Sequence, residues 1–137
     1  MRKRSFVLAL LWVVAGCARN AGPPAIELGV ECATCGMEVS DLRFACERST
    51  AQGWRVYDSI ECLLRDDAAG ESVLADYDAK SLHLSDDLWV IHGSFPSPMG
   101  GGYAAFVSRA TADSVAARTT SVVGRLEHFR HEEGSRP

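Results

Sequence analysis

The chain has 137 residues, which suffice for one small domain or two very small ones. It carries 14 Lys and Arg against 18 Asp and Glu, a formal net charge of −4. Nucleic-acid binding requires a basic surface, so this excess of acidic residues argues against a nucleic-acid partner.

The N-terminus is typical of a secretory signal peptide. Basic residues at positions 2–4 precede an apolar run over 6–14, which is far shorter than the ~20 residues that span a bilayer. The pattern therefore predicts a signal peptide over 1–16. The run ends in VAGC, which is similar to the bacterial lipobox, and this likeness implies cleavage before Cys17 and a lipid on its thiol. A plain signal peptide with Cys17 as a bystander is the alternative.

A mature chain that begins at Cys17 would be extracytoplasmic, on the periplasmic side, and anchored by its lipid to a bacterial membrane. Its first residues, 17–29, contain Gly22-Pro23-Pro24 and have no periodicity, so we expect a flexible tether. Loss of the signal removes three basic residues and leaves 11 Lys and Arg against 18 Asp and Glu, a formal charge of −7.

Two strands and a helix are predicted in the first half of the mature chain. LRFACER at 42–48 alternates in polarity, as does WRVY at 54–57, and the pair forms a predicted hairpin. Asp58-Ser59 is an N-cap signal for a helix that runs from Ser59 to about Ala69 and ends at Gly70. A weak strand signal follows at 72–84.

The second half repeats this order. Its predicted elements are a strand at 88–92, an irregular loop at 95–102, a strand at 103–107, a helix at 111–119, a strand at 122–129 and a disordered tail at 131–137. The fold class is therefore predicted to be α+β, with two similar ββαβ units over about 30–85 and 86–130 that form antiparallel sheets.

Four cysteines remain once Cys17 is assigned to the lipid, and two of them stand in the stretch CATCGM, at positions 32 and 35. No helix begins at this pair, which argues against a thioredoxin-type redox motif. No second CxxC or HxxxH exists to complete a structural zinc site. A Cys32–Cys35 disulfide or two inert thiols remain open, because an oxidising compartment permits either.

Met37 offers a further interpretation of this stretch. A thiolate and a thioether are both soft donors, and soft donors select Cu(I). The Cys35-Gly36-Met37 spacing lets a tight turn direct both sulfurs at one ion. Met99, in the Pro/Gly loop SPMGGG, is poorly placed for a core and suits a presented ligand. His92, at the end of the strand that leads into this loop, is another candidate.

The stretches CATCGMEVS, VYDSIECLLRD and WVIHGSFPSPMGGGYAAFVSRATADSVA, in this order behind a lipobox, resemble the NosL family of copper-binding lipoproteins. The resemblance runs from about Cys32 to Arg125. It implies a protein that binds one Cu(I) and delivers copper for maturation of the copper–sulfide centre of nitrous oxide reductase. It also implies a duplicated ββαβ fold similar to that of organomercurial lyase, and contact with a membrane copper-delivery or ABC-type maturation complex.

Residue by residue, Cys35 and Met37 match the Cys-Gly-Met pair of the family, and Met99 matches the methionine of its Pro-Met-Gly loop. Asp58 matches an aspartate before the helix, which we interpret first as an N-cap and only second as a functional residue. Cys62 matches a helix cysteine that we expect to pack as a small hydrophobe.

The sequence thus predicts a Cu(I) metallochaperone and not an enzyme. Cys35 and Met37 would bind the metal, Met99 or His92 would complete the site, and Cys32 and Asp58 are accessory candidates. One alternative is a thiol oxidoreductase or a lyase-like enzyme that uses Cys46 or Cys62 near Cys35 with Asp58. Another is a non-catalytic lipoprotein with a Cys32–Cys35 disulfide.

Overall fold

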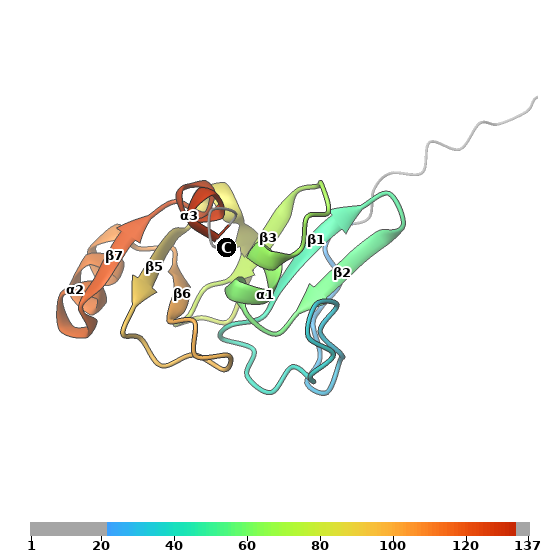
Figure 1. The fold of residues 1–137 in the computed structure, drawn as a ribbon, viewed down its shortest axis with the longest axis horizontal. Helices are drawn as coiled ribbons and strands as arrows, with labels where there is room; N and C mark the ends of the chain where they lie inside the picture. Colours follow the sequence, from blue (N-terminus) through green and yellow to red (C-terminus); the bar gives the residue numbers. More distant parts are fainter. Residues whose placement is uncertain (1–21, 134–137) are drawn as a thin grey trace, which may run out of the picture.

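The structure, a computed structural model, describes residues 22–133 and contains two antiparallel sheets (Figure 1). The predicted signal peptide, Cys17 and the first part of the predicted tether lie outside the described residues. Residues 22–27 have no regular secondary structure. No helix in the described range is long and apolar enough to cross a bilayer.

The first sheet has four strands in the order β2-β1-β3-β4. The bounds are β1 Cys46–Thr50, β2 Gly53–Tyr57, β3 Ser72–Ala75 and β4 Leu82–Leu84, with helix α1, Ile60–Arg65, between β2 and β3. A short 3₁₀ helix, η1, Ser85–Asp87, leads into the second half.

The second sheet has three strands in the order β6-β5-β7. The bounds are β5 Trp89–Gly93, β6 Tyr103–Phe106 and β7 Ser121–Gly124, with helices α2, Arg109–Thr119, and α3, Leu126–Glu133. In each half the first strand is central and pairs antiparallel with the second and third, while a helix connects those two. The predicted α+β class with two antiparallel ββαβ units is confirmed; β4 and α3 are additions.

The start of the first strand and the end of the first helix differ clearly from prediction. Strand β1 begins at Cys46, because residues 42–44 form a turn in which Asp41 accepts hydrogen bonds from the backbone N–H and the guanidinium of Arg43. Helix α1 ends four residues early, at Arg65. The carbonyls of Leu63 in the helix and of Asp66, its C-cap, accept hydrogen bonds from the buried Arg48 side chain.

The predicted strand over 122–129 was wrong in its second half, where α3 begins at Leu126. Leu126 and Phe129 are buried and stand three residues apart, which is the spacing of one helical face. Helix α3 continues to Glu133 and so covers the start of the tail that was predicted to be disordered; residues 134–137 lie outside the described range.

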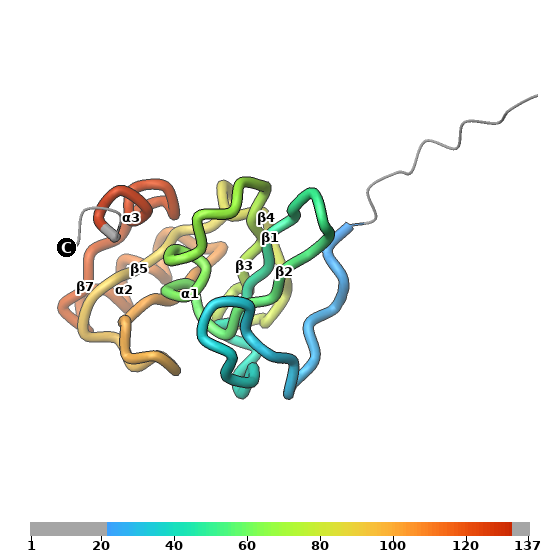
Figure 2. Tube along the Cα trace, turned by 45° about the vertical axis from the view of Figure 1, so that its right-hand side comes forward, coloured from blue at the N-terminus to red at the C-terminus, as the bar shows by residue number. Residues whose placement is uncertain are grey.

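Helix α1 lies at the junction of the two halves (Figures 1 and 2). Its buried residues, which include Cys62 and Leu63, share one core cluster with Cys46 of the first sheet and with Val90 and Tyr103 of the second. The two sheets therefore bury α1 together, and the start of this helix is held by contacts from both halves.

Glu47, on the central strand β1, is an exception to the apolar packing of the first sheet. Its side chain is 0% exposed, and neither carboxylate oxygen has a hydrogen-bond partner. Its cross-strand neighbours are Val56 and Val73. Burial in this apolar setting raises the pKa of Glu47 from 4.5 to about 7.

We expect Glu47→Gln to stabilise the protein above pH 7 and to leave its stability unchanged below pH 4.5. A pKa raised by folding means that the folded state binds the proton more tightly than the unfolded state. The wild type should therefore lose stability as the pH rises from 4.5 to about 7, by at most about 3 kcal/mol. Urea denaturation across this range measures the difference, and parallel stability curves for the two proteins would contradict the expectation.

Candidate metal centre

The two cysteines of the CATCGM stretch lie on a short hairpin, residues 27–39, which we call the cysteine hairpin. Its arms meet at a bridge between Glu31 and Glu38. The backbone N–H of Cys32 donates to the Met37 carbonyl at 2.8 Å, and that of Gly36 donates to the Cys32 carbonyl at 2.9 Å. Gly36 has φ +72°, a left-handed conformation that glycine adopts without strain.

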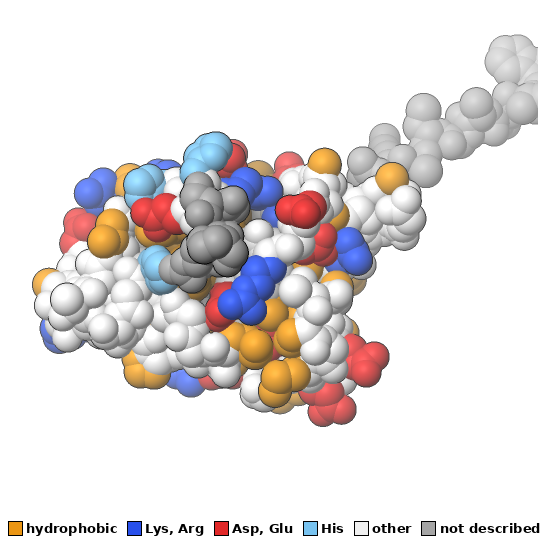
Figure 3. All heavy atoms as spheres, viewed as in Figure 1, with side chains coloured by type: hydrophobic (Ala, Val, Ile, Leu, Met, Phe, Trp, Pro, Cys, Tyr) orange, Lys and Arg blue, Asp and Glu red, His pale blue; other side chains and the backbone are white. Residues whose placement is uncertain are grey.

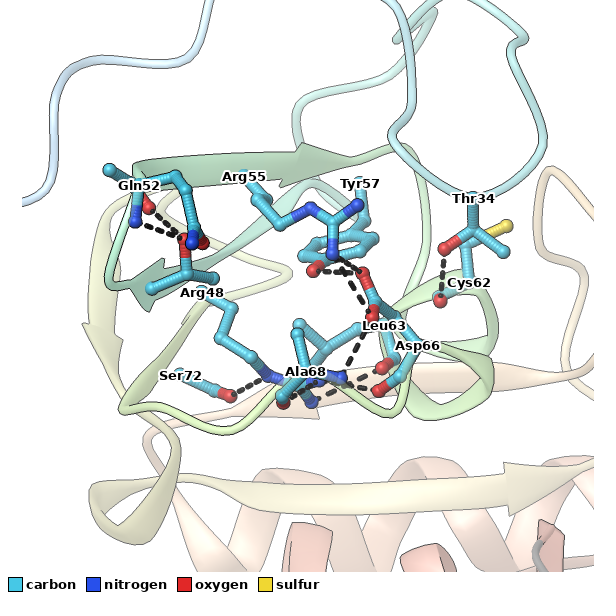
Figure 4. A network of polar contacts seen from close by, with 12 residues as sticks. Thr34, Arg48, Gln52, Arg55, Tyr57, Cys62, Leu63, Asp66, Ala68 and Ser72 are labelled. Carbon is cyan, nitrogen blue, oxygen red and sulfur yellow. Dashed lines mark hydrogen bonds and ion pairs between the residues drawn. The ribbon is translucent and has the colours of Figure 1, made fainter.

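The turn of the cysteine hairpin is fastened to the first half of the domain. The backbone N–H of Ala33 donates to the carbonyl of Val56 on β2 at 2.8 Å. The Thr34 hydroxyl donates to the carbonyl of Cys62 on α1 at 2.8 Å, a contact drawn in Figure 4. These two bonds hold the turn of the hairpin over the first turn of α1.

Ser59 is the N-cap of α1, since its hydroxyl accepts a hydrogen bond from the backbone N–H of Cys62 at 3.3 Å. The interpretation of Asp58 as the N-cap is therefore wrong. The Asp58 side chain is only 4% exposed, and its Oδ1 has no hydrogen-bond partner. A buried carboxylate oxygen without a donor is costly, so Asp58 is a candidate functional group.

Four side chains converge at this point: Cys32, Cys35, Asp58 and Cys62, one ligand atom from each, all within 4.8 Å of one another. With metal–sulfur bonds of about 2.3 Å, two sulfurs on one ion lie roughly 3.8–4.6 Å apart. The cluster therefore requires little rearrangement to hold a single ion. Cys35 is half-buried and the other three are buried, so Cys35 is the sulfur nearest to solvent.

The surroundings of Cys35 and Cys62 favour the protonated form of these two thiols. Burial raises the pKa of Cys35, and the backbone N–H of Met37 opposes this only in part. Burial also raises the pKa of Cys62 far above its ordinary value, and the negative charge of Asp58 adds to the effect. A metal ion that binds here must displace thiol protons. A nucleophilic redox cysteine needs the opposite shift, a lowered pKa.

The two predicted methionine ligands flank the cluster in different ways. Met37 follows Cys35 on the cysteine hairpin and is 57% exposed. Met99 is half-buried and packs, as Cys35 does, against the core cluster that contains Cys32 and Cys62. The Met99 loop passes along the start of α1, where a Cβ at Gly101 would collide with the Glu61 carboxylate.

His92 has other partners. Its ring stacks on Tyr103 with centroids 4.0 Å apart and meets Phe129 edge-on at 5.8 Å. Its Nδ1 lies 4.0 Å from Glu132 Oε2 on α3. Among the described residues, the cluster of ligand atoms does not include His92.

The copper-binding interpretation of the sequence gave Cys62 no role as a ligand and expected it to pack as a small hydrophobe. It is fully buried, but its sulfur belongs to the cluster. Asp58 precedes the N-cap of α1 and Cys62 lies in its first turn, so no helical spacing in the sequence indicated the pair. Cys46 lies in the same core without joining the cluster, and burial raises the pKa of its thiol. All four cysteines of the described range are free thiols.

No protein-family model matches the chain, and no curated protein matches it significantly. Among solved structures, the chain is similar to the copper chaperone NosL from Shewanella denitrificans, with a TM-score of 0.67 and 18% sequence identity. The match covers 77% of this chain and 92% of that one. The chain therefore has a NosL-like fold, and its cluster of three cysteines and an aspartate could hold a metal ion.

Proposed function

We propose that this protein is a lipid-anchored, extracytoplasmic carrier of Cu(I) that delivers copper for assembly of the copper–sulfide centre of nitrous oxide reductase. The convergence of Cys32, Cys35 and Cys62 in one partly exposed cluster carries the proposal. The likeness to a copper chaperone supports it at the level of the fold. A membrane copper-delivery or ABC-type maturation complex would be a second partner.

The donor set accounts for the choice of ion. Thiolates and thioethers are soft ligands and favour Cu(I) over hard and most borderline cations. Cys35, half-buried at the turn of the hairpin, would receive the ion first, with the exposed Met37 thioether beside it. Met99, Cys32 and Cys62 would compete for the remaining positions.

The exposure of the site suits a carrier better than an enzyme. An acceptor can approach Cys35 and Met37 from solvent and replace one donor at a time, so the ion need not be released free. An oxidoreductase or lyase would need an activated thiolate, whereas the pKa values of Cys35 and Cys62 are raised. The protein would therefore bind copper stoichiometrically and turn nothing over.

Removal of the proposed central sulfur should abolish tight binding. We expect Cys35→Ala to weaken Cu(I) binding by at least about 100-fold, and Met37→Ala or Met99→Ala by about tenfold each. His92→Ala, which removes ring contacts and the approach to Glu132 but no member of the cluster, serves as the control. Competition with a Cu(I)-chelating dye measures affinity, and X-ray absorption counts the sulfur ligands. If Cys32→Ala weakened binding as much as Cys35→Ala, the site would be a dithiolate and the Cys35–Met37 pair would not be its centre.

Asp58→Asn distinguishes a site that prefers the soft ion Cu(I) from one that prefers a borderline ion such as Zn²⁺. The substitution retains the size of the side chain and removes its charge. A carboxylate is a poor ligand for Cu(I), so we expect Cu(I) affinity to change by less than about threefold. Zn²⁺ accepts carboxylate oxygen and should bind at least about tenfold more weakly. Parallel titrations with the two ions make the comparison, and a larger loss for Cu(I) than for Zn²⁺ would contradict the soft-donor assignment.

The lipid anchor has its own test. In bacterial cells grown with radiolabelled palmitate, the wild-type protein should carry label and sediment with membranes. Cys17→Ala should lose both properties, since the lipobox thiol would be the acylation site. Label that remained on Cys17→Ala would rule out this residue as the anchor.

A further inference from the structure

The two faces of the cysteine hairpin differ in chemistry. Side chains alternate between the faces along each arm, and directly paired residues share a face. Because Glu31 pairs with Glu38, these two glutamates lie together on one face. The other face carries apolar and sulfur-containing side chains, namely Val30, Cys32, Met37 and Val39, and Leu28 lies in the turn that precedes Val30.

Part of the apolar surface of the cysteine hairpin is exposed to solvent. Cys32 and Val39 are buried, whereas Leu28 is 62%, Val30 37% and Met37 57% exposed. Six large hydrophobic side chains are exposed within residues 22–133, and these three are half of them. Such a concentration of apolar surface next to a ligand site is characteristic of an interaction surface.

The acidic side chains of the cysteine hairpin are equally unusual. Glu27, Glu31 and Glu38 are exposed, and none has an ion pair or hydrogen bond through its side chain within the described range. Like charges directly opposite each other destabilise a strand pair, as at Glu31 and Glu38. A cation seated between these two carboxylates would remove that repulsion. Figure 3 shows hydrophobic and acidic side chains next to each other at the lower right, where Figure 1 draws the cysteine hairpin.

We propose that the cysteine hairpin is the docking surface for the copper acceptor, and that the acceptor presents an apolar patch bordered by Lys and Arg. The proposal rests on the carrier function proposed above. An apolar patch on the acceptor would cover Leu28, Val30 and Met37, and its basic groups would pair with Glu31 and Glu38.

The charges select this occupant over two others. Anionic lipid headgroups would be repelled by three unpaired glutamates. A second copy of the chain would bring the same glutamates face to face. Only a protein surface that is both apolar and basic interacts favourably with the apolar and the acidic side chains of the hairpin. Docking there places the acceptor beside Cys35 at the turn.

The test compares Cu(I) transfer from the loaded protein to apo nitrous oxide reductase with transfer to a small Cu(I)-chelating dye. We expect the wild-type rate to the enzyme to fall at least about tenfold between low and high salt. Glu31→Lys with Glu38→Lys should be at least about tenfold slower at low salt and insensitive to salt. Asp86→Lys with Asp87→Lys, on η1 after β4 at the opposite edge of the first sheet, introduces the same charge change and should behave as wild type.

Transfer to the dye separates docking from metal binding, and it should be the same for all of these proteins. Val30→Ser tests the apolar half and should slow transfer to the enzyme alone.

If the Glu31→Lys/Glu38→Lys variant supplies the enzyme at the wild-type rate, the proposed docking surface is wrong, although the proposed carrier function still stands. The docking surface is also overturned if transfer to the dye slows equally, since the substitutions would then have altered the metal site. Binding of the wild type to phosphatidylcholine vesicles that is lost in Val30→Ser would assign the patch to a membrane instead. Wild-type protein that binds Cu(I) but supplies none to the enzyme would overturn the proposed delivery and its docking partner together.

Discussion

A single buried arginine determines where α1 ends, and the position of α1 determines the rest of the site. Arg48, on the central strand of the first sheet, is 0% exposed. Its guanidinium donates to the carbonyls of Leu63, Asp66 and Ala68 and its Nε to the Ser72 hydroxyl (Figure 4). The N–H groups of a buried guanidinium need hydrogen-bond acceptors. The segment between α1 and β3 therefore wraps around Arg48 and supplies them.

The consequence is a helix of six residues whose first turn lies between the two halves of the domain. Ser59 caps that turn, and the carbonyl of Cys62 accepts a hydrogen bond from the Thr34 hydroxyl of the cysteine hairpin. Both the helix and the hairpin are thus positioned by bonds that do not use the cysteine sulfurs. The sulfurs remain available to a metal, while the surrounding backbone is already ordered, which reduces the cost of ordering on binding.

The two halves of the domain have the same topology but contribute unequally to the candidate metal site. The first half contributes every member of the cluster, from the hairpin, from the end of β2 and from α1. The second half contributes core residues against α1 and the loop that carries Met99. A short helix packed by both sheets therefore joins the ligand set in one half to a glycine-rich loop in the other.

The sequence by itself determined the repeated strand–strand–helix–strand order, because alternation, caps and glycines are local signals that tertiary contacts here reinforce. It also identified Cys35, Met37 and Met99 as soft donors. It misplaced the end of α1 and the start of α3, since the Arg48 contacts and the burial of Leu126 and Phe129 come from distant parts of the chain. Only the tertiary structure decided that Cys32, Asp58 and Cys62 meet at Cys35, because that meeting depends on a hydrogen bond between residues 28 positions apart, from Thr34 to Cys62.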